Sequence, residues 1–592
     1  MRYHHLMALC GLSLVSAAQD NPQIKADIRA DTNRDGRIDL KGTSDVIGKT
    51  KWSSTSGALF LPNIGDTDRR CSKKALSGPA LSNAKLDGCN DASDNIQRAP
   101  RYLAPLKTVP IPSASQNTKG TVTIPNATQR KFTRIFRKQG KKWIFVDEKH
   151  TFSQQELQAG LELGIDARDT RRPNLWDGRV TVQFDVRNGN DKSSDKVMLR
   201  VAPVLTHHHL QKVDQVLAVQ GNKTDGPYLV DFINTLSSVV KTAGITKDLH
   251  LFNASDDIWA QDFVEPGYAS MPGPKGTVSI RIMIRCPQDE RVAGRQLFEY
   301  YRQAGVGAVQ HLGGKRDEIN SGGNIEAIPP YTYKGKTWPA GRVILGNHGK
   351  QKHHILPYLE AQESQYPLLL DTAWLAIGHV DEFLQFLPAK NKRGWVAVID
   401  DPRAAIKLLQ DTRKAGHGSL PAISRKNDTS SGPGGNCGFM CGPIPVNSPT
   451  VAQVLADKKL MKLNEQCAQR IEANIKTLVK EVGLTDDDII RIPALFKPSD
   501  FPGADSKRLQ VGAFFPGAVN NLVLTGYNTC VAPNPWGPVV KGKDIIGETI
   551  RAKYAKIGQM IKFIDDWNTH HNFGGEVHCG TNSIRDMSAR WW

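Results

Sequence analysis

Residues 180–190 read VTVQFDVRNGN, and this stretch decides the fold of the N-terminal part of the chain. Its apolar residues stand at every second position, as in a strand with one buried face. The turn residues at 188–190 follow, and a second apolar run covers 197–201. The stretch therefore predicts a β-hairpin. Similar short runs between clusters of Gly, Pro and Asn continue over residues 19–204 and predict an immunoglobulin-like β-sandwich domain.

The remaining residues, 205–592, follow a different pattern. Strand-like runs at 278–284, 343–345, 395–399 and 522–524 alternate with helical ones. In the clearest helix, 460–482, apolar residues recur every three or four positions and Gly483 follows as a C-cap. This alternation predicts an α/β domain of catalytic size, so the chain is classed as a multidomain α+β protein. A Ser-, Gly- and Pro-rich stretch at 428–435 predicts an exposed loop, and no internal repeat is visible.

The composition disfavours several classes of protein. The chain has 592 residues, of which 39% are hydrophobic and 23% charged. These are the values of an ordinary globular protein, and the length suggests roughly two to four domains. The net charge is +18, but the cations are scattered, so we expect no nucleic-acid partner. No stretch after the N-terminus approaches the ~20 apolar residues of a membrane span, so we expect no membrane partner either. Nothing in the sequence indicates an oligomeric state.

Residues 1–18 are predicted to be a secretory signal peptide. A short basic flank precedes the apolar run at 6–15, and the small residues at 16–18 provide a cleavage site. The alternative is a buried N-terminal helix. Four Asn-x-Ser/Thr sequons agree with export of a glycoprotein: Asn126, Asn222, Asn253 and Asn427. We therefore expect a secreted, extracellular protein.

Two polar clusters in the predicted sandwich offer oxygen ligands to a hard cation. The first consists of Asp31, Asn33, Asp35 and Asp39 around Gly36. The twelfth position counted from its first residue is a glycine, so the cluster is not a full EF-hand. The second cluster consists of Asn63, Asp66, Asp68, Asp87, Asn90, Asp91 and Asp94. The alternative is a set of solvated Asx turns. Because two clusters occur in one domain, the sequence favours Ca²⁺.

Three polar stretches in the α/β part carry the residues for catalysis. They read WAQDFVE at 259–265, GHVDEF at 378–383 and GEVHCGTN at 575–582. The two aspartates Asp262 and Asp381 can grip a planar guanidinium through paired, charge-assisted hydrogen bonds. A thiolate at Cys579 can attack its central carbon, while His379 moves protons.

Each of these residues also has an ordinary structural alternative. His379 can be a core histidine that has Asp381 as its hydrogen-bond partner. Cys579 can be an inert buried thiol or half of a disulfide, and Asp262 can be a helix cap. Residue chemistry alone leaves both interpretations open.

The three stretches, together with DIWAQD at 257–262 and PNPWGP at 533–538, resemble the protein-arginine deiminases. The resemblance runs through 205–592 and extends more loosely over the predicted sandwich. It implies a five-fold α/β propeller for the catalytic domain. The chain departs from the animal members in two ways: the first of their two sandwich domains is absent, and the predicted signal peptide is not found in those cytosolic enzymes. It therefore resembles a secreted, fungal-type member.

The resemblance assigns a role to each catalytic residue: Cys579 is the nucleophile, His379 the general acid and base, and Asp262 and Asp381 the guanidinium-binding carboxylates. It also implies substrate contacts for Trp259 and for Arg291, which is the arginine nearest to the position of the family's substrate-binding arginine.

A calcium site in the catalytic domain is implied by the same resemblance. Its ligands are the side chains of Gln261, Glu265 and Glu326 and the carbonyls of Gly322 and Ile325. A second calcium site is implied to be lost, because Phe263, Arg285 and Cys286 occupy its ligand positions, where a fixed cation replaces the metal.

The predicted activity is therefore calcium-dependent hydrolysis of peptidyl-arginine to peptidyl-citrulline and ammonia through a covalent cysteine intermediate. The expected partners are arginine-containing proteins or peptides. One alternative is a deiminase of free arginine or agmatine, which can use a similar set of residues. The other is a non-catalytic secreted calcium-binding interaction protein.

The cysteine count adds one expectation. Of nine cysteines, Cys10 leaves with the signal peptide and Cys579 must stay free, so an odd number remains. At least one more is therefore expected to be free, and Cys286 is the best candidate. The possible bridges are Cys71–Cys89, Cys437–Cys441 and Cys467–Cys530.

Overall fold

The structure is a computed structural model that describes residues 24–221, 226–253, 257–349, 351–428, 444–499 and 510–592. The predicted signal peptide, most of the predicted loop at 428–435, the sequon residue Asn222 and the pair Cys437 and Cys441 lie outside these ranges. Among the helices within them, none combines the length and apolarity that a bilayer crossing requires.

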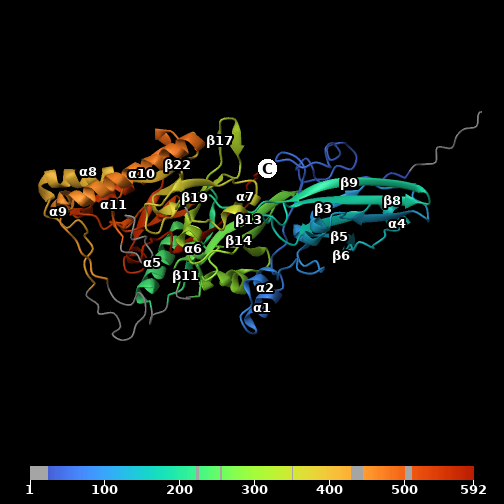
Figure 1. The fold of residues 1–592 in the computed structure, drawn as a ribbon, viewed down its shortest axis with the longest axis horizontal. Helices are drawn as coiled ribbons and strands as arrows, with labels where there is room; N and C mark the ends of the chain where they lie inside the picture. Colours follow the sequence, from blue (N-terminus) through green and yellow to red (C-terminus); the bar gives the residue numbers. More distant parts are fainter. Residues whose placement is uncertain (1–23, 222–225, 254–256, 350, 429–443, 500–509) are drawn as a thin grey trace, which may run out of the picture.

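Two β-sheets make up the N-terminal part of the described chain (Figure 1). The five-stranded sheet has the order β1 (Ile28–Arg29), β3 (Ala104–Thr108), β7 (Glu162–Ala167), β5 (Thr133–Gln139), β6 (Lys142–Phe145). The four-stranded sheet has the order β2 (Ala58–Phe60), β9 (Asp191–Val201), β8 (Arg179–Asn188), β4 (Lys119–Thr123). Short helices connect their strands: α1 (Arg70–Leu76), α2 (Asn83–Asp87), α3 (Ala127–Phe132) and α4 (Gln154–Ala159).

The predicted hairpin is confirmed. Strands β8 and β9 pair antiparallel along their whole length, and every second residue of β8 from Val180 to Val186 is buried. Leu106 and Ile165 of the five-stranded sheet pack in one hydrophobic cluster with Val182 of β8. The same cluster contains Ile282 of residues 205–592, the predicted catalytic part of the chain. The two sheets and the catalytic part therefore share a core.

Five small mixed sheets carry the catalytic part of the described residues. Their strand orders are β12 (His250–Phe252), β11 (Val213–Val219), β31 (Thr581–Arg585); β10 (Leu205–Thr206), β13 (Val264–Gly273), β14 (Gly276–Arg285), β15 (Val306–Gln310); β16 (Ile325–Ile328), β19 (Arg342–Asn347), β20 (Leu368–Asp371); β21 (Leu384–Pro388), β22 (Trp395–Asp401), β23 (Ile489–Pro493); and β26 (Leu522–Leu524), β27 (Thr529–Pro533), β30 (Met560–Ile564). The predicted strands at 278–284, 343–345, 395–399 and 522–524 lie in β14, β19, β22 and β26.

All five of these sheets repeat one topology. In each sheet, one strand pairs antiparallel with one neighbour and parallel with the other. These strands are β11, β14, β19, β22 and β27. A parallel pair needs a crossover connection, and helices supply most of it. The crossovers contain α5 (Pro227–Ala243), α7 (Leu356–Ala361), α8 (Pro402–Thr412) with α9 (Val451–Ala456) and α10 (Lys458–Val482), and α11 (Ile545–Lys556). Between β14 and β15 the chain forms the helical turns Val292–Arg295 and Leu297–Tyr301.

The last strand of the chain completes the first of these sheets. Strand β31 pairs antiparallel with β11, so the two ends of the catalytic part are hydrogen-bonded to each other. The sequence showed no repeat, yet the backbone repeats the same three-stranded arrangement.

The long helix α10 confirms the helix predicted from periodicity. Its buried face includes Leu463, Ile471 and Leu478, and Asp457 caps its first turn by accepting two backbone N–H groups. Gly483 ends it with a φ of 73°, a left-handed conformation that glycine adopts at little cost. Figure 1 shows α10 with α8 and α11 at the end of the molecule opposite the two N-terminal sheets.

The cysteines divide into one bridge and four free thiols within the described residues. Cys71 and Cys89 form a disulfide, whereas Cys286, Cys467, Cys530 and Cys579 are free and buried. The expected free thiol at Cys286 is confirmed. The possible bridge between Cys467 and Cys530 is not formed, because the two side chains pack in different hydrophobic clusters.

Candidate active site

The predicted catalytic residues lie in equivalent segments of the repeated sheets. In each sheet, one strand pairs antiparallel with β11, β14, β19, β22 or β27; these partner strands are β31, β13, β16, β21 and β26. A short connecting segment precedes each partner strand. In chain order the partner strands are β13, β16, β21, β26 and β31. These segments carry Asp262, Gly323, Asp381, Asn520 and Cys579, in that order, and the first three residues lie in short helical turns. The contacts described below show that the five segments meet at one centre.

The thiol of Cys579 lies beside a carboxylate and an amide. Its Sγ is 3.8 Å from Oδ2 of Asp381 and 3.4 Å from Nδ2 of Asn520. The Oδ1 of Asn520 accepts the backbone N–H groups of His578 and Cys579 at 3.0 and 3.2 Å, which fixes the loop. Burial, followed by the charges of Asp381 and Asp262, raises the pKa of the thiol well above its usual range. A cation bound between the two carboxylates would reverse this effect.

The imidazole of His379 is held by one ring nitrogen and presents the other. Its Nε2 lies 2.9 Å from the carbonyl oxygen of Glu318 and donates to it. Its Nδ1 faces Asp262 at 3.9 Å and Asp381 at 4.0 Å. Burial opposes a charge on the ring, but these carboxylates and Glu318 outweigh it and raise the pKa of His379. A protonated ring poised in this way can act as a general acid.

Three polar atoms at this centre are buried without a hydrogen-bond partner: Oδ1 of Asp262, Nδ1 of His379 and Oδ1 of Asp381. The unpaired Nδ1 of His379 lies 3.9 Å from Oδ1 of Asp262 and 4.0 Å from Oδ1 of Asp381. Gly323 lies beside this group: an added Cβ would be 2.7 Å from the imidazole Nδ1, 3.2 Å from Oδ1 of Asp262 and 3.2 Å from Oδ2 of Asp381. Buried polar groups are rarely left unpaired, so an unpaired set of this kind indicates a ligand. Two acceptors and a proton carrier suit a planar cation with several N–H groups.

The other oxygen of each carboxylate is already held by the protein. Oδ2 of Asp381 accepts from Nδ1 of His578 at 2.8 Å, and Oδ2 of Asp262 accepts from Arg291 at 3.4 Å. Burial raises the pKa of Asp262 to about 6, although Arg291 and His379 favour its charged form. Each carboxylate is therefore fixed on one side and open on the other.

The two residues predicted to contact the substrate both contact other residues of the protein. Arg291 is buried behind Asp262, and its remaining N–H groups donate to Asp257, Gln288 and Ser321. Its guanidinium is thus engaged by the protein itself. Trp259 is half-buried, precedes the catalytic helix α6 (Ala260–Phe263), and contacts the ring of His570 edge to face.

Four of the predicted calcium ligands line one cavity of about 30 Å³: Gln261, Glu265, Ile325 and Glu326. Oε1 of Gln261 is buried without a partner, and oxygen donors are the ligands that Ca²⁺ prefers. Burial and the facing Glu326 raise the pKa of Glu265 well above its usual range, which a cation would counter. Arg585 also lines the cavity. The carbonyl of the fifth residue, Gly322, accepts the N–H of Ile325.

The positions of the implied lost calcium site hold apolar and cationic side chains. Phe263 packs in a hydrophobic cluster, and Cys286 is a free, buried thiol. The guanidinium of Arg285 is buried and donates to Gln310, Asn83 and two backbone carbonyls. A fixed cation therefore lies there.

The first oxygen cluster of the N-terminal part is engaged by its own loop. Asp31 accepts the N–H groups of residues 35 and 36, and Asp39 accepts those of residues 41 and 42. Asn33 and Asp35 are bonded to each other, and Asp35 also accepts the N–H of residue 37. These contacts form Asx turns. The buried Asp45, which the sequence did not indicate, accepts from Thr32 and from the N–H of Asp39.

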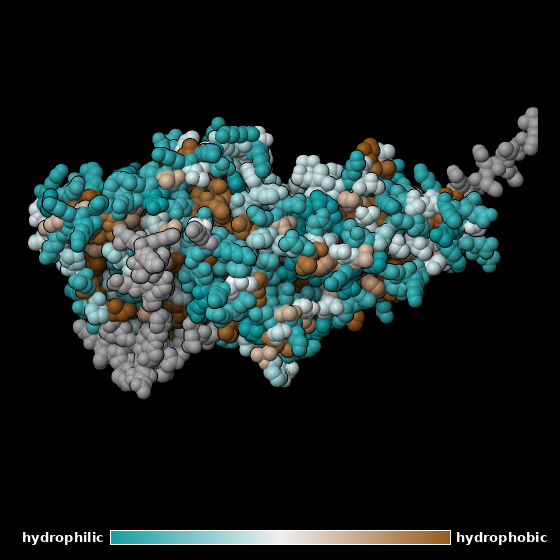
Figure 2. Space-filling model, viewed as in Figure 1, coloured by the Kyte–Doolittle hydropathy of each residue, from teal (hydrophilic) through white to brown (hydrophobic). Residues whose placement is uncertain are grey.

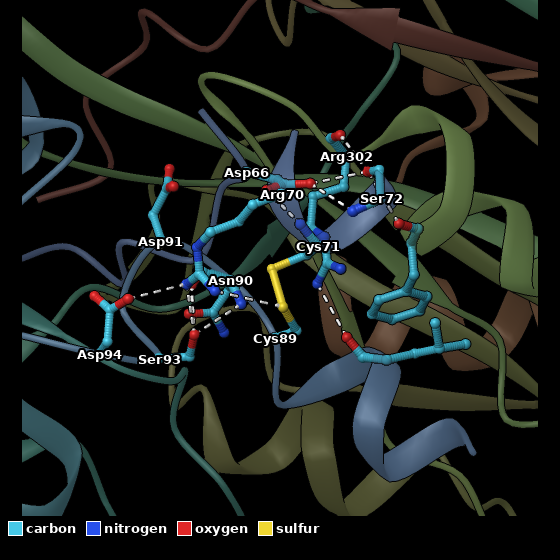
Figure 3. The surroundings of a disulfide bond; sticks show 12 residues. Asp66, Arg70, Cys71, Ser72, Cys89, Asn90, Asp91, Ser93, Asp94 and Arg302 are labelled. Carbon is cyan, nitrogen blue, oxygen red and sulfur yellow. Dashed lines mark hydrogen bonds and ion pairs between the residues drawn. A yellow bond between two sulfur atoms is a disulfide. The ribbon is translucent and has the colours of Figure 1, made fainter. Parts of the chain in front are cut away.

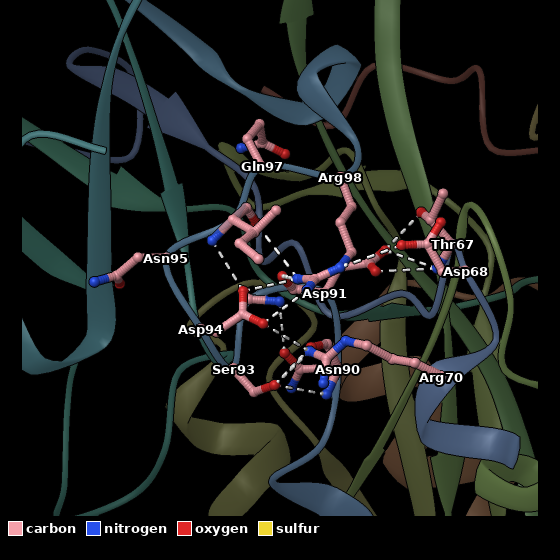
Figure 4. Close-up of polar contacts among 12 residues, drawn as sticks. Thr67, Asp68, Arg70, Asn90, Asp91, Ser93, Asp94, Asn95, Gln97 and Arg98 are labelled. Atoms are coloured by element: carbon pink, nitrogen blue, oxygen red, sulfur yellow. Dashed lines mark hydrogen bonds and ion pairs between the residues drawn. The ribbon is translucent and has the colours of Figure 1, made fainter. Parts of the chain in front are cut away.

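The second cluster is likewise divided among protein donors. Asn63 donates to Asp166, Asp66 accepts from the first turn of α1, and Asp91 accepts from Thr67. Asp68 and Asp87 form ion pairs with Arg98 and Arg172 at 3.3 and 3.0 Å. Figure 4 shows Arg98 extending between Asp68 and Asp94. Within the described residues, the only three carboxylate, histidine or cysteine side chains close enough to share an ion are Glu326, Asp381 and His578.

Three site residues were not singled out by sequence reasoning. His578 stands within the quoted GEVHCGTN stretch, so its position next to Cys579 was a usable signal. Asn520 and Glu318 lie in stretches with no recognisable motif, and only their contacts with Cys579 and His379 reveal them.

Comparison with known proteins agrees with the family resemblance of the sequence motifs. The sequence profile described as "Protein-arginine deiminase (PAD)" matches residues 191–592. Protein-arginine deiminase type-4 of Mus musculus is 31% identical over 468 residues, which cover 76% of this chain and 62% of that protein. Protein-arginine deiminase type-3 of Homo sapiens is 32% identical over 412 residues, covering 67% of this chain and 56% of that protein. The chain thus spans about 60% of the length of these relatives.

Among solved structures, the agmatine deiminase of C. jejuni is 13% identical and has a TM-score of 0.35, over 65% of this chain and 96% of that one.

Proposed function

Since the chain belongs to the protein-arginine deiminase family, we propose that it hydrolyses the guanidinium of arginine residues in proteins or peptides. The products are citrulline residues and ammonia. One observation carries the proposal: the unpaired Nδ1 of His379 lies within 4.0 Å of the unpaired oxygens of Asp262 and Asp381, and the other oxygen of Asp381 reaches the Cys579 thiol.

In the proposed reaction, Asp262 and Asp381 hold the guanidinium, and its charge favours the thiolate of Cys579. The thiolate attacks the central carbon and forms a C–S bond. His379 protonates the departing nitrogen, the C–N bond breaks, and ammonia leaves an amidino-thioether on the enzyme. His379 then takes a proton from water, whose oxygen attacks the same carbon. The hydroxyl proton passes to solvent as the C–S bond breaks, which releases the citrulline residue and regenerates the Cys579 thiolate.

We propose peptidyl-arginine as the substrate, because curated relatives named as protein-arginine deiminases match the chain at about 30% identity. A deiminase of free arginine or agmatine remains the alternative. The test is mass spectrometry of a blocked arginine peptide and of free arginine after incubation with the enzyme. Replacement of =NH by =O adds roughly one dalton. Conversion of free arginine alone would refute the peptidyl assignment, and conversion of neither would refute the proposed function.

We propose that Ca²⁺ binds between Gln261, Glu265 and Glu326. The unpaired oxygen of Gln261 and the facing carboxylates support this assignment. An ion bound there would compensate the buried negative charge beside the catalytic loops. Asp262 is the next residue after Gln261, so the same ligand set would also hold this carboxylate in place.

We propose that residues 205–592 form a five-fold α/β propeller and residues 19–204 an immunoglobulin-like β-sandwich. The five repeats of one sheet topology, and the pairing of β31 with β11, support the propeller. The shared apolar cluster of the two N-terminal sheets supports the sandwich.

We propose that the enzyme acts outside the cell. The predicted signal peptide and sequons support export, and the Cys71–Cys89 disulfide is typical of an oxidising compartment. Secretion of the full chain from a host cell, with the N-terminus of the product determined by sequencing, tests this assignment. A protein that stays inside the cell with residues 1–18 still attached would refute this assignment.

A further inference from the structure

We propose that the disulfide segment, residues 71–89, positions the catalytic carboxylate of Asp262 through Arg285 and Arg291. This inference rests on the proposed function, because it concerns the same active centre. It gives the N-terminal part a role in catalysis that is independent of any metal.

The disulfide segment docks on the catalytic part of the chain. Cys71 lies on α1 and Cys89 follows α2, so the bridge closes a loop that contains both helices (Figure 3). The hydroxyl of Ser72 reaches the carbonyls of Phe298 and Arg302 at 3.4 and 3.5 Å, and Arg302 donates to the carbonyl of Leu86 at 3.1 Å. Both helices contact the turn Leu297–Tyr301, and α2 also contacts β15 (Figure 1).

The disulfide segment also makes apolar contacts with the catalytic part. Ala75 of α1 and Leu86 of α2 are buried in one hydrophobic cluster with Ala260 and Phe263, the two ends of the helix that carries Asp262. The segment therefore packs in the core that supports the catalytic helix. Unlike this apolar core, the surface visible in Figure 2 is predominantly hydrophilic, and its hydrophobic residues are scattered.

Asn83, at the start of α2, connects the disulfide segment to Arg285 through a hydrogen bond. Its Oδ1 accepts from Arg285 at 2.8 Å and from Arg295 at 3.1 Å. Its carbonyl accepts from the amide of Gln310 at 2.6 Å. Gln310 in turn accepts from Arg285 at 3.0 Å, so one side of the Arg285 guanidinium is fixed by these two residues.

The other side of Arg285 holds the loop that leads to the active centre. Its second terminal nitrogen donates to the carbonyls of Asp289 and Arg291 at 3.3 and 3.2 Å. Arg285 is only 1% exposed, and charged hydrogen bonds in such surroundings are strong. Arg285 therefore joins the disulfide segment to the backbone of this loop.

Arg291 completes the connection. Its Nε donates to Asp257 at 2.7 Å, and a terminal nitrogen reaches Oδ2 of Asp262 at 3.4 Å. This leaves Oδ1 of Asp262 unpaired for the substrate. The helix that carries Asp262 has four residues, too few to fix a side chain without tertiary contacts. Arg285 and Arg291 are thus positioning residues, and the disulfide segment is their anchor.

The test compares Asn83→Ala with Asn83→Asp and with a matched control, Asn95→Ala. Asn95 also accepts from an arginine, Arg168 at 2.7 Å, but it is exposed and lies within the N-terminal part (Figure 4). We expect Asn83→Ala to lower kcat/KM roughly tenfold, the effect of losing the charged hydrogen bond from Arg285; the second bond, from Arg295, is not part of the connection. Asn83→Asp keeps the acceptor and is expected to restore most of the activity, and the control to match wild type.

A second readout does not depend on turnover. Hydrogen exchange at residues 285–291 is expected to accelerate in Asn83→Ala and in the double variant Cys71→Ser/Cys89→Ser, with the melting temperature of Asn83→Ala equal to that of the control. Equal kcat/KM for Asn83→Ala and Asn95→Ala would overturn the inference, as would failure of Asn83→Asp to restore activity. A wild-type protein with no deiminase activity would instead refute the proposed function, while the exchange measurement would still decide whether the segment holds the loop.

Discussion

Replacing Gly323 by Ala is expected to block the space proposed for the guanidinium. The added Cβ would lie 2.7 Å from Nδ1 of His379 and 3.2 Å from oxygens of Asp262 and Asp381. The backbone of Gly323 is outside the left-handed region that favours glycine, so the chain itself tolerates alanine. The substitution therefore tests occupancy of this space with little backbone strain.

The size of the effect follows from the contacts that the substrate would lose. Each charge-assisted hydrogen bond contributes about 1.5–3 kcal/mol, so loss of one to each carboxylate costs about 3–6 kcal/mol. That corresponds to a decrease of at least roughly a hundredfold in kcat/KM. The crowding of His379 is expected to cost about 1–3 kcal/mol of folding stability, because overpacked sites relax only in part.

The assay is citrulline formation from a blocked arginine peptide, with peptide binding to the Cys579→Ala form measured by calorimetry. The matched control is Gly512→Ala on β25 (Val511–Ala513), where the nearest atoms to an added Cβ are 3.9 Å away. Calorimetry separates lost binding from lost chemistry. If Gly323→Ala kept kcat/KM within about threefold of wild type while folded, the space around Gly323 would not be the guanidinium site.

Four further outcomes are expected. Cys579→Ser should lower kcat by at least about a thousandfold with the fold intact, because a hydroxyl is a far weaker nucleophile than a thiolate; substantial residual turnover would remove this residue as nucleophile. The kcat/KM profile should be bell-shaped: activity falls below pH 6 as Asp262, with a pKa raised by burial to about 6, takes up a proton, and falls at alkaline pH as His379 loses its proton; a flat profile through pH 6 would contradict this. Excess chelator should abolish activity and Glu326→Gln should raise the Ca²⁺ concentration required, whereas full activity in chelator would exclude the proposed ion. Unfolding without reductant should expose at least the four free thiols of the described residues, and a smaller count would contradict the disulfide assignment.

Local patterns in the sequence were sufficient for individual elements. The alternation at 180–186 predicted β8, and the apolar spacing at 460–482 predicted α10, because each depends on which face of a single element is buried. The four proposed catalytic residues were singled out because their motifs are contiguous stretches of chain that resemble those of a known family. Counting predicted at least one further free thiol, and Cys286 was chosen because the family resemblance placed it at the lost calcium site.

The ion clusters show where sequence reasoning was insufficient. Carboxylates at Asp68 and Asp87 have the composition of a cation site, but whether they face an ion or an arginine depends on distant residues. In the structure, Arg98 and Arg172 occupy those positions. A sequence states which donors exist, not which of them packing brings within about 3 Å of a given oxygen.

The tertiary structure alone decided two features. The five sheets repeat one topology without any visible sequence repeat, because many sequences satisfy the same strand pairing when only the burial of each face is specified. The proposed active centre exists because the segments carrying Asp262, Asp381 and Cys579, which precede strands of three different sheets, meet in space, and the pairing of β31 with β11 positions the last of them. The sequence determined the chemistry available to this protein. Long-range strand pairing determined that its two carboxylates, imidazole and thiol share one buried space, because only packing across hundreds of residues fixes which side chains leave an atom unpaired.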